Sequence, residues 1–208
     1  MARVIPLLLC ALLACACATD NDVPPMSERY APDSWTYEGR PSTYERFMRA
    51  VREPILRRPG DLDGFRRRLR MLFFAGFHRA YAVRVDELED GSARVRIVSV
   101  TGFGPRPRHI GQEESFALSA DAMRQLDEAI RASRLASLPA RAFDHVCIDG
   151  AFLYFELADA QGSHLISRHN CDLSRELEDL VWRLDGLRRT VDWNLADYRV
   201  GPFLRAGE

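Results

Sequence analysis

The pattern of apolar residues is clearest between residues 144 and 187, where it predicts a β-hairpin followed by a helix. Residues 151–157 are almost all apolar or aromatic and contain no helix breaker, which is typical of a strand buried on at least one face. Residues 159–162 predict a turn, because Gly162 can take a positive φ. Residues 164–169 then form the second strand.

An amphipathic helix follows this hairpin. Its apolar stripe consists of Leu173, Leu177, Leu180, Val181, Leu184 and Leu187. Asp172 is expected to cap the first turn, and Arg188 and Arg189 lie near the end, where cations interact favourably with the helix dipole. The helix therefore offers one face to the core directly after the hairpin.

Cys147 precedes the hairpin and Cys171 follows it, so folding of the hairpin brings them together. A register that sets them directly opposite leaves a loop of about five residues, within the usual range for hairpins. A slip of one residue exchanges the two faces of the strands. The pattern thus leaves open whether Glu156 and His164 share a face.

The preceding part of the chain predicts a helix and then strands. Residues 42–45 form a capping box in front of an apolar helical face, and Pro54 ends that helix near Arg52. Residues 62–77 fit both a helix and a strand. We favour a strand over residues 68–75, because alternating strands follow.

Alternation predicts these strands over residues 81–85 and 94–100, with a turn at residues 89–92. Their solvated face is expected to consist of Arg84, Arg94 and Arg96. Ser119 then caps a further amphipathic helix. The predicted fold class is α+β: an antiparallel β meander and a C-terminal β-hairpin packed against two or three amphipathic helices, with one disulfide.

The amino terminus has the pattern of a secretory signal. A short basic start precedes an apolar run of about ten residues, too short to span a bilayer, and small residues and cysteines follow. The motif Leu12-Leu13-Ala14-Cys15 resembles a bacterial lipoprotein signal, in which the cysteine is lipidated and becomes the first mature residue. Cys15 is the predicted lipidation site and Cys17 the second choice. Ordinary cleavage after Ala-x-Ala is the alternative.

This pattern divides the chain into a signal peptide (residues 1–14), a lipid anchor with a flexible polar tether (residues 15–41) and one globular domain (residues 42–208). An alanine follows either candidate cysteine, where an aspartate would indicate retention in the inner membrane. The resemblance therefore implies a periplasmic protein anchored by lipid to the outer membrane. Its expected contacts are the membrane and a protein partner in the cell envelope.

Charge and cysteine content limit the chemistry. A formal net charge of −1 gives no general attraction to nucleic acid, so we expect no nucleic-acid partner. No spacing matches a familiar metal or cofactor motif, so we expect neither. In an exported protein the two mature cysteines, Cys147 and Cys171, are predicted to form a disulfide. A Cys–His nucleophile with His169 and a thiolate metal site are the alternatives.

The hairpin region gathers a set of polar candidate binding residues: Asp149, Glu156, His164, Arg168 and His169. An acid–base site needs such groups within a few ångströms of one another. In the alternative interpretation, which we favour, Glu156 pairs with Arg168 or His164 as an ordinary cross-strand pair.

A glycine-rich loop at residues 102–111 is a second candidate site. Its glycines expose backbone N–H groups, and Arg106, Arg108 and His109 add positive charge, so an anion could bind there. The alternative is a solvated loop between strands, since no phosphate-binding fingerprint is present.

The chain resembles a family of uncharacterised bacterial envelope proteins of unknown function. The matching residues are Asp149-Gly150-Ala151, Glu156, Gly162, His164 and Arg168, followed by the leucine-rich helix. Ser163 and His169 stand where the family pattern has aromatic residues. The resemblance implies an exported α+β domain and brings no known activity.

Two function classes remain open on sequence alone. The first is a non-enzymatic binding module of the cell envelope, anchored by lipid, which the lack of a catalytic motif favours. The second is a small periplasmic enzyme, hydrolase-like, that uses Glu156 and His164. A closed pocket that contains both side chains would favour the second class.

Overall fold

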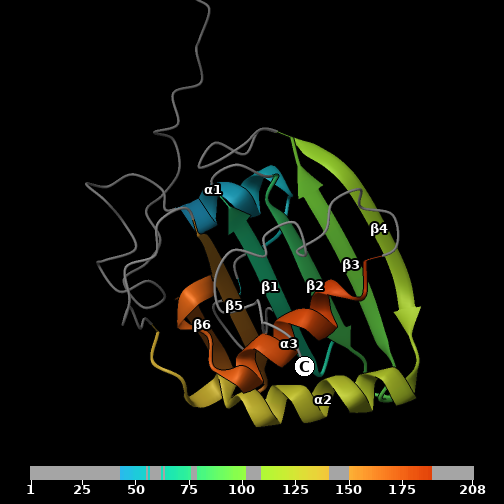
Figure 1. The fold of residues 1–208 in the computed structure, drawn as a ribbon. Helices are drawn as coiled ribbons and strands as arrows, with labels where there is room; N and C mark the ends of the chain where they lie inside the picture. Colours follow the sequence, from blue (N-terminus) through green and yellow to red (C-terminus); the bar gives the residue numbers. More distant parts are fainter. Residues whose placement is uncertain are drawn as a thin grey trace, which may run out of the picture. The chain divides into compact units, whose positions relative to one another are not determined.

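The computed structural model describes residues 43–54, 56, 62, 64–75, 79–101, 109–140 and 150–188. All of them belong to one unit, Ser42–Glu208. They form an antiparallel sheet with helices on both faces, which confirms the α+β prediction (Figure 1). No helix within these ranges combines the length and the hydropathy needed to cross a membrane.

The sheet contains six strands in the order β4-β3-β2-β1-β5-β6. In chain order they are β1 (Arg67–Ala75), β2 (Tyr81–Glu87), β3 (Ala93–Val100), β4 (Ile110–Leu118), β5 (Ala151–Asp159) and β6 (Gly162–His169). The meander and the C-terminal hairpin are thus parts of one sheet, because β5 pairs with β1.

Two helices cover one face of the sheet and pack against each other: α2 (Ala120–Ser133) and α3 (Arg175–Asp185). Figure 1 shows α3 lying across the strands with α2 beside it. The apolar core between them and the sheet includes Leu69, Met71, Phe73, Val83, Ile97, Leu153, Phe155, Met123, Leu126, Leu177, Leu180 and Leu184. Because successive side chains of a strand point to opposite faces, the strand residues of this core all lie on the same face of the sheet.

The opposite face is buried where α1 covers it, although it carries many charges. Helix α1 (Thr43–Ala50) packs there through Tyr44, Phe47 and Met48, each at most 1% exposed. The predicted helix is confirmed, but Ser42 of the proposed capping box lies outside the described residues. The helix ends at Ala50, and the left-handed residue Arg52, with φ 57°, follows it before Pro54.

Serine hydroxyls begin the other two helices. Ser119 accepts a hydrogen bond from the Ala122 amide at 3.2 Å, as predicted for α2. For α3 the cap is Ser174, which accepts from the Leu177 amide. The predicted cap at Asp172 is therefore wrong: this residue ends a short 3-10 turn, η4 (Asn170–Asp172), that delays the helix.

The hairpin confirms the predicted turn and supplies the register that the sequence left open. Only Ala160 and Gln161 separate the strands, and Gly162 has the expected positive φ, 153°. Phe152 pairs with His169. In the register that sets Cys147 directly opposite Cys171, with its loop of about five residues, Phe152 would pair with Ile166, so the hairpin adopts a different register.

Candidate functional site

Glu156 lies in a buried polar cluster between β5 and α1. The Tyr44 hydroxyl donates to its Oε2 at 2.9 Å, and the Leu56 amide donates to its Oε1 at 3.3 Å. Arg70, its neighbour on β1, forms an ion pair with the same carboxylate. Glu156 is 1% exposed, and its partner on β6 is Leu165, so the expected cross-strand pairing with Arg168 or His164 is wrong.

Three arginines on neighbouring strands line up beside this cluster. Arg70 pairs with Arg84 across β1 and β2, and Arg84 pairs with Arg96 across β2 and β3. Like charges directly opposite one another destabilise a sheet. Glu53, three residues after α1, neutralises the row: it accepts from Arg70 Nη2 at 2.9 Å and also binds Arg84 and Arg96.

We call Tyr44, Glu53, Arg70, Arg84, Arg96 and Glu156 the ionic clamp, because it joins α1 and the following turn to four strands. Glu53 and Arg70 were not predicted from the sequence, and Arg84 and Arg96 were expected to be solvated. Their side chains are only 18% and 14% exposed. The strand sequences alone give no sign of this burial, because the row of arginines becomes buried only when α1 packs over this face.

The pKa values of the two carboxylates in the ionic clamp are shifted in opposite directions. Burial raises the pKa of Glu53, but Arg70, Arg84 and Arg96 together outweigh it and leave that pKa lowered. Burial also raises the pKa of Glu156 and outweighs the opposing effect of Arg70, so that pKa is raised. Burial and the nearby Glu156 charge raise the pKa of Tyr44 well above its ordinary value.

His164 and Arg168 lie on the opposite face from Glu156. Their strand partners are Leu157 and Leu153, whereas Glu156 pairs with Leu165. The ring of His164 is hydrogen-bonded through Nε2 to the Leu138 carbonyl at 2.8 Å. Arg168 donates from Nη2 to the Pro139 carbonyl at 2.7 Å.

These contacts hold residues 138–140 beside the outer edge of β6. The Ser167 amide completes the contact by donating to the Ala140 carbonyl at 2.8 Å. His164 and Arg168 therefore attach a connecting segment to the sheet, and the structure does not bring either of them to Glu156.

His169 occupies a third environment at the end of the hairpin. Its ring meets Phe152 edge-on with centroids 5.0 Å apart, and its Nδ1 lies 3.2 Å from Cys171 Sγ. A Cβ on Gly150 would lie 1.8 Å from His169 Cε1, so the chain passes unusually close to the ring. Burial lowers the pKa of His169.

Several predicted residues lie outside the described part of the chain: Cys15, Cys17, Arg106, Arg108, Cys147 and Asp149. His109 is described and exposed, and its carbonyl accepts from the Thr101 amide at 2.8 Å. The anion loop therefore stays a prediction. The described ranges contain no group of three or more His, Cys, Asp or Glu residues that could hold a metal ion.

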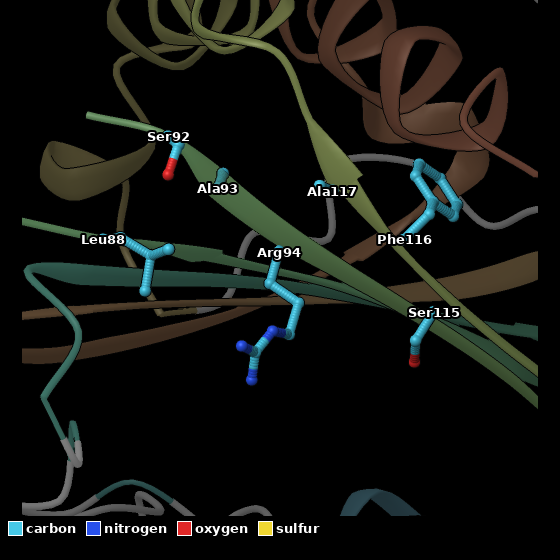
Figure 2. Close-up of a pocket in the computed structure, with 7 residues that line it drawn as sticks. All are labelled: Leu88, Ser92, Ala93, Arg94, Ser115, Phe116 and Ala117. Atoms are coloured by element: carbon cyan, nitrogen blue, oxygen red, sulfur yellow. The ribbon is translucent and has the colours of Figure 1, made fainter. Parts of the chain in front are cut away.

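A hollow of about 280 Å³ opens at the β3–β4 end of the clamp-side face (Figure 2). Its lining residues are Leu88, Ser92, Ala93, Arg94, Ser115, Phe116 and Ala117. Figure 2 shows the side chains of Leu88, Arg94 and Ser115 on one side of the strands and the Phe116 ring turned toward the other. Arg94 is exposed, as expected from sequence, but its place in a hollow was not foreseen.

Comparison with known proteins adds no family: no protein-family model matches the chain, and no curated protein matches it. The resemblance to envelope proteins therefore stays a prediction.

Proposed function

We propose that this chain is an exported, lipid-anchored binding module of the cell envelope. The amino-terminal pattern supports export: residues 1–14 serve as the signal peptide, residues 15–41 as anchor and tether, and residues 42–208 as the globular domain. Cys15 carries the lipid, with Cys17 as second choice. The protein then faces the periplasm from the outer membrane and binds a partner there.

One observation carries the choice of a binding module over an enzyme. The two residues that the enzyme alternative would use are each engaged by the fold: Glu156 by Tyr44 and Arg70, and His164 by the Leu138 carbonyl. Glu156 and His164 also lie on opposite faces of the sheet. The hydrolase alternative needs both side chains in one pocket, and the geometry does not favour it.

A disulfide between Cys147 and Cys171 belongs to the same proposal. The close approach of Gly150 to His169 and Asn170 supports it, because the chain entering β5 lies beside the chain leaving β6. Cys147 is three positions before Gly150, a span of at most about 10 Å, so the Cα separation of a disulfide is within reach. Alkylation of the purified chain with and without reductant, followed by mass analysis, tests this bond.

Lipid attachment is tested by expressing the full chain in a bacterium with two membranes and labelling it with a fatty-acid analogue. We expect label on the wild-type protein, loss of label in Cys15→Ala and retained label in Cys17→Ala. Loss only in Cys17→Ala would move the site to the second choice. Label-free wild-type protein that is recovered without the membrane would overturn the anchor.

Partner binding is tested in the same cells by site-specific photocrosslinking. A photoreactive residue replaces Ser115 in the hollow or, as a control, Arg183 on the exposed side of α3. We expect one defined envelope protein crosslinked from position 115 and not from position 183. Equal, non-specific crosslinks from both positions would contradict a binding module that uses this face.

A further inference from the structure

We infer that the hollow beside Arg94 binds a carboxylate carried on a small apolar group. This inference deepens the proposed binding function and rests on it, since it names the chemistry of the ligand. Three observations support it: the guanidinium has no partner among the described residues, the hollow has a suitable shape, and the surrounding charges favour a single negative charge.

The lack of a partner follows from the strand register. Arg94 lies directly opposite Asp86 on β2, but Arg68 and Arg84 already bind this carboxylate, which is fully buried. The other strand arginines in the described ranges bind carboxylates or backbone carbonyls. Among them, Arg94 alone makes no side-chain hydrogen bond or ion pair, and its donors remain open to a ligand.

The shape of the hollow depends on Ala117. This residue lies directly opposite Arg94 on β4, where its single methyl group leaves space beside the guanidinium. Leu88 supplies an apolar wall on the β2 side. The volume of about 280 Å³ is slightly below the roughly 300–1,000 Å³ of pockets for drug-sized ligands, so a small group fits.

The local charges favour a carboxylate over a phosphate. Arg94 presents a planar pair of N–H donors that matches a carboxylate, and it is the one cation among the described residues that line the hollow. Asp90 lies in the adjoining turn and accepts from the Ser92 hydroxyl at 2.6 Å. A dianion would face this carboxylate with a single arginine to balance it, whereas a monoanion is neutralised by Arg94 alone.

The test uses the full chain in non-ionic detergent and saturation-transfer NMR of small ligands. The probes are hexanoate and N-acetyl-leucine, each paired with its neutral amide, and a short peptide with a free or amidated C-terminal leucine. Two variants remove different features: Arg94→Gln removes the charge, and Ala117→Val fills the space. Arg183→Gln, an exposed arginine on α3, is the matched control.

We expect the acids to bind wild type and the control at least tenfold more tightly than the amides. Arg94→Gln should weaken acid binding by roughly 10- to 100-fold, as expected for loss of a hydrogen bond to a charged group. Ala117→Val should abolish binding of acids and amides alike. Preference for the peptide over both free acids would identify a partner's terminal carboxylate, and the reverse would identify a free acid.

Equal binding of acids and amides, or unchanged binding by Arg94→Gln, would overturn the inference. So would the absence of binding by every probe at millimolar concentration. If Ala117→Val lowers the thermal midpoint and fails to fold, the comparison of acid binding between Arg94→Gln and wild type alone decides the test. If Arg94→Gln binds the acids as tightly as wild type while the envelope crosslink from position 115 persists, this inference fails and the proposed binding function stands.

Discussion

Arg70 donates from Nη2 to Glu53 Oε2 across 2.9 Å, although neither side chain is more than 2% exposed. Glu53 comes from the turn after α1, and Arg70 comes from the centre of the sheet. A buried ion pair contributes little on its own, because desolvation of both charges opposes the attraction. Removal of one partner is costly, since it leaves the other charge buried.

We therefore expect substitutions of the two carboxylates of the ionic clamp to lower the free energy of unfolding by different amounts. Glu53→Gln should lower the free energy of unfolding by about 3 kcal/mol, because Arg70, Arg84 and Arg96 then face one another without their shared carboxylate. Glu156→Gln should cost about 1 kcal/mol, because Arg70 keeps Glu53 and the amide can still accept from Tyr44. Urea unfolding of both variants gives the comparison, and a larger cost for Glu156→Gln would contradict it.

The pKa shifts of Glu53 and Glu156 predict that the free energy of unfolding changes with pH in two separate pH ranges. Glu53 has a lowered pKa, so its contribution is present above its unfolded value near 4.5 and is lost as pH falls through the folded pKa. Glu156 has a raised pKa, so its burial lowers stability as pH rises from about 4.5 to the folded pKa.

Unfolding free energy should therefore respond differently in the two variants. Glu53→Gln should flatten the loss of stability below pH 4.5, and Glu156→Gln should remove a decrease above it. Denaturant unfolding at a series of pH values measures both slopes. Parallel curves for wild type and both variants would refute the assignment.

Arg52 predicts a stabilising substitution. Its φ of 57° lies in the left-handed region, where side chains with a Cβ are strained, and it lies just after α1. Arg52→Gly should raise the free energy of unfolding by about 0.5–1 kcal/mol. Arg49→Gly, within the same helix, is the control and should lower it by a similar amount. Thermal unfolding of both variants would show opposite shifts, and shifts of the same sign would count against the prediction.

Gly150 predicts a steric cost at the end of the hairpin. A methyl group there would overlap His169 and Asn170, so Gly150→Ala should cost about 1–3 kcal/mol. His169→Ala should recover part of this cost when combined with it, since the nearest atom is on the His169 ring. A double-mutant cycle measures the coupling, and strict additivity of the two changes would exclude the predicted contact.

The fold was largely predictable because its apolar positions carry the period of each element. Leu69, Met71 and Phe73 recur at every second position as the core face of a strand, and the leucines of α3 recur on one helical stripe. Strand β4 was not predicted. Its sequence contains Gly111, Gln112 and Glu113, which have low β propensity, and pairing with β3 stabilises it instead.

The candidate site was much less predictable. Glu156 was identified as a notable residue, but its partners Arg70 and Tyr44 are distant in sequence and follow no motif. The separation of Glu156 from His164 depends on a register that the turn residues alone left open. Arg94 resembles Arg84 and Arg96 in sequence. The three differ in their contacts with two buried carboxylates, because Arg84 binds both Glu53 and Asp86 and Arg96 binds Glu53.

The pairing of β1 with β5 has a consequence for the order of folding. Arg70 and Glu156 are 86 positions apart in the chain, so their contact forms only after the C-terminal hairpin has been synthesised. Until then one edge of β1 is unpaired and Arg70 lacks the second of its two carboxylate partners, and a charged edge discourages strand addition by other chains. The last strands to emerge thus complete both the sheet and its charge balance, and a chain truncated before β5 should remain incompletely folded.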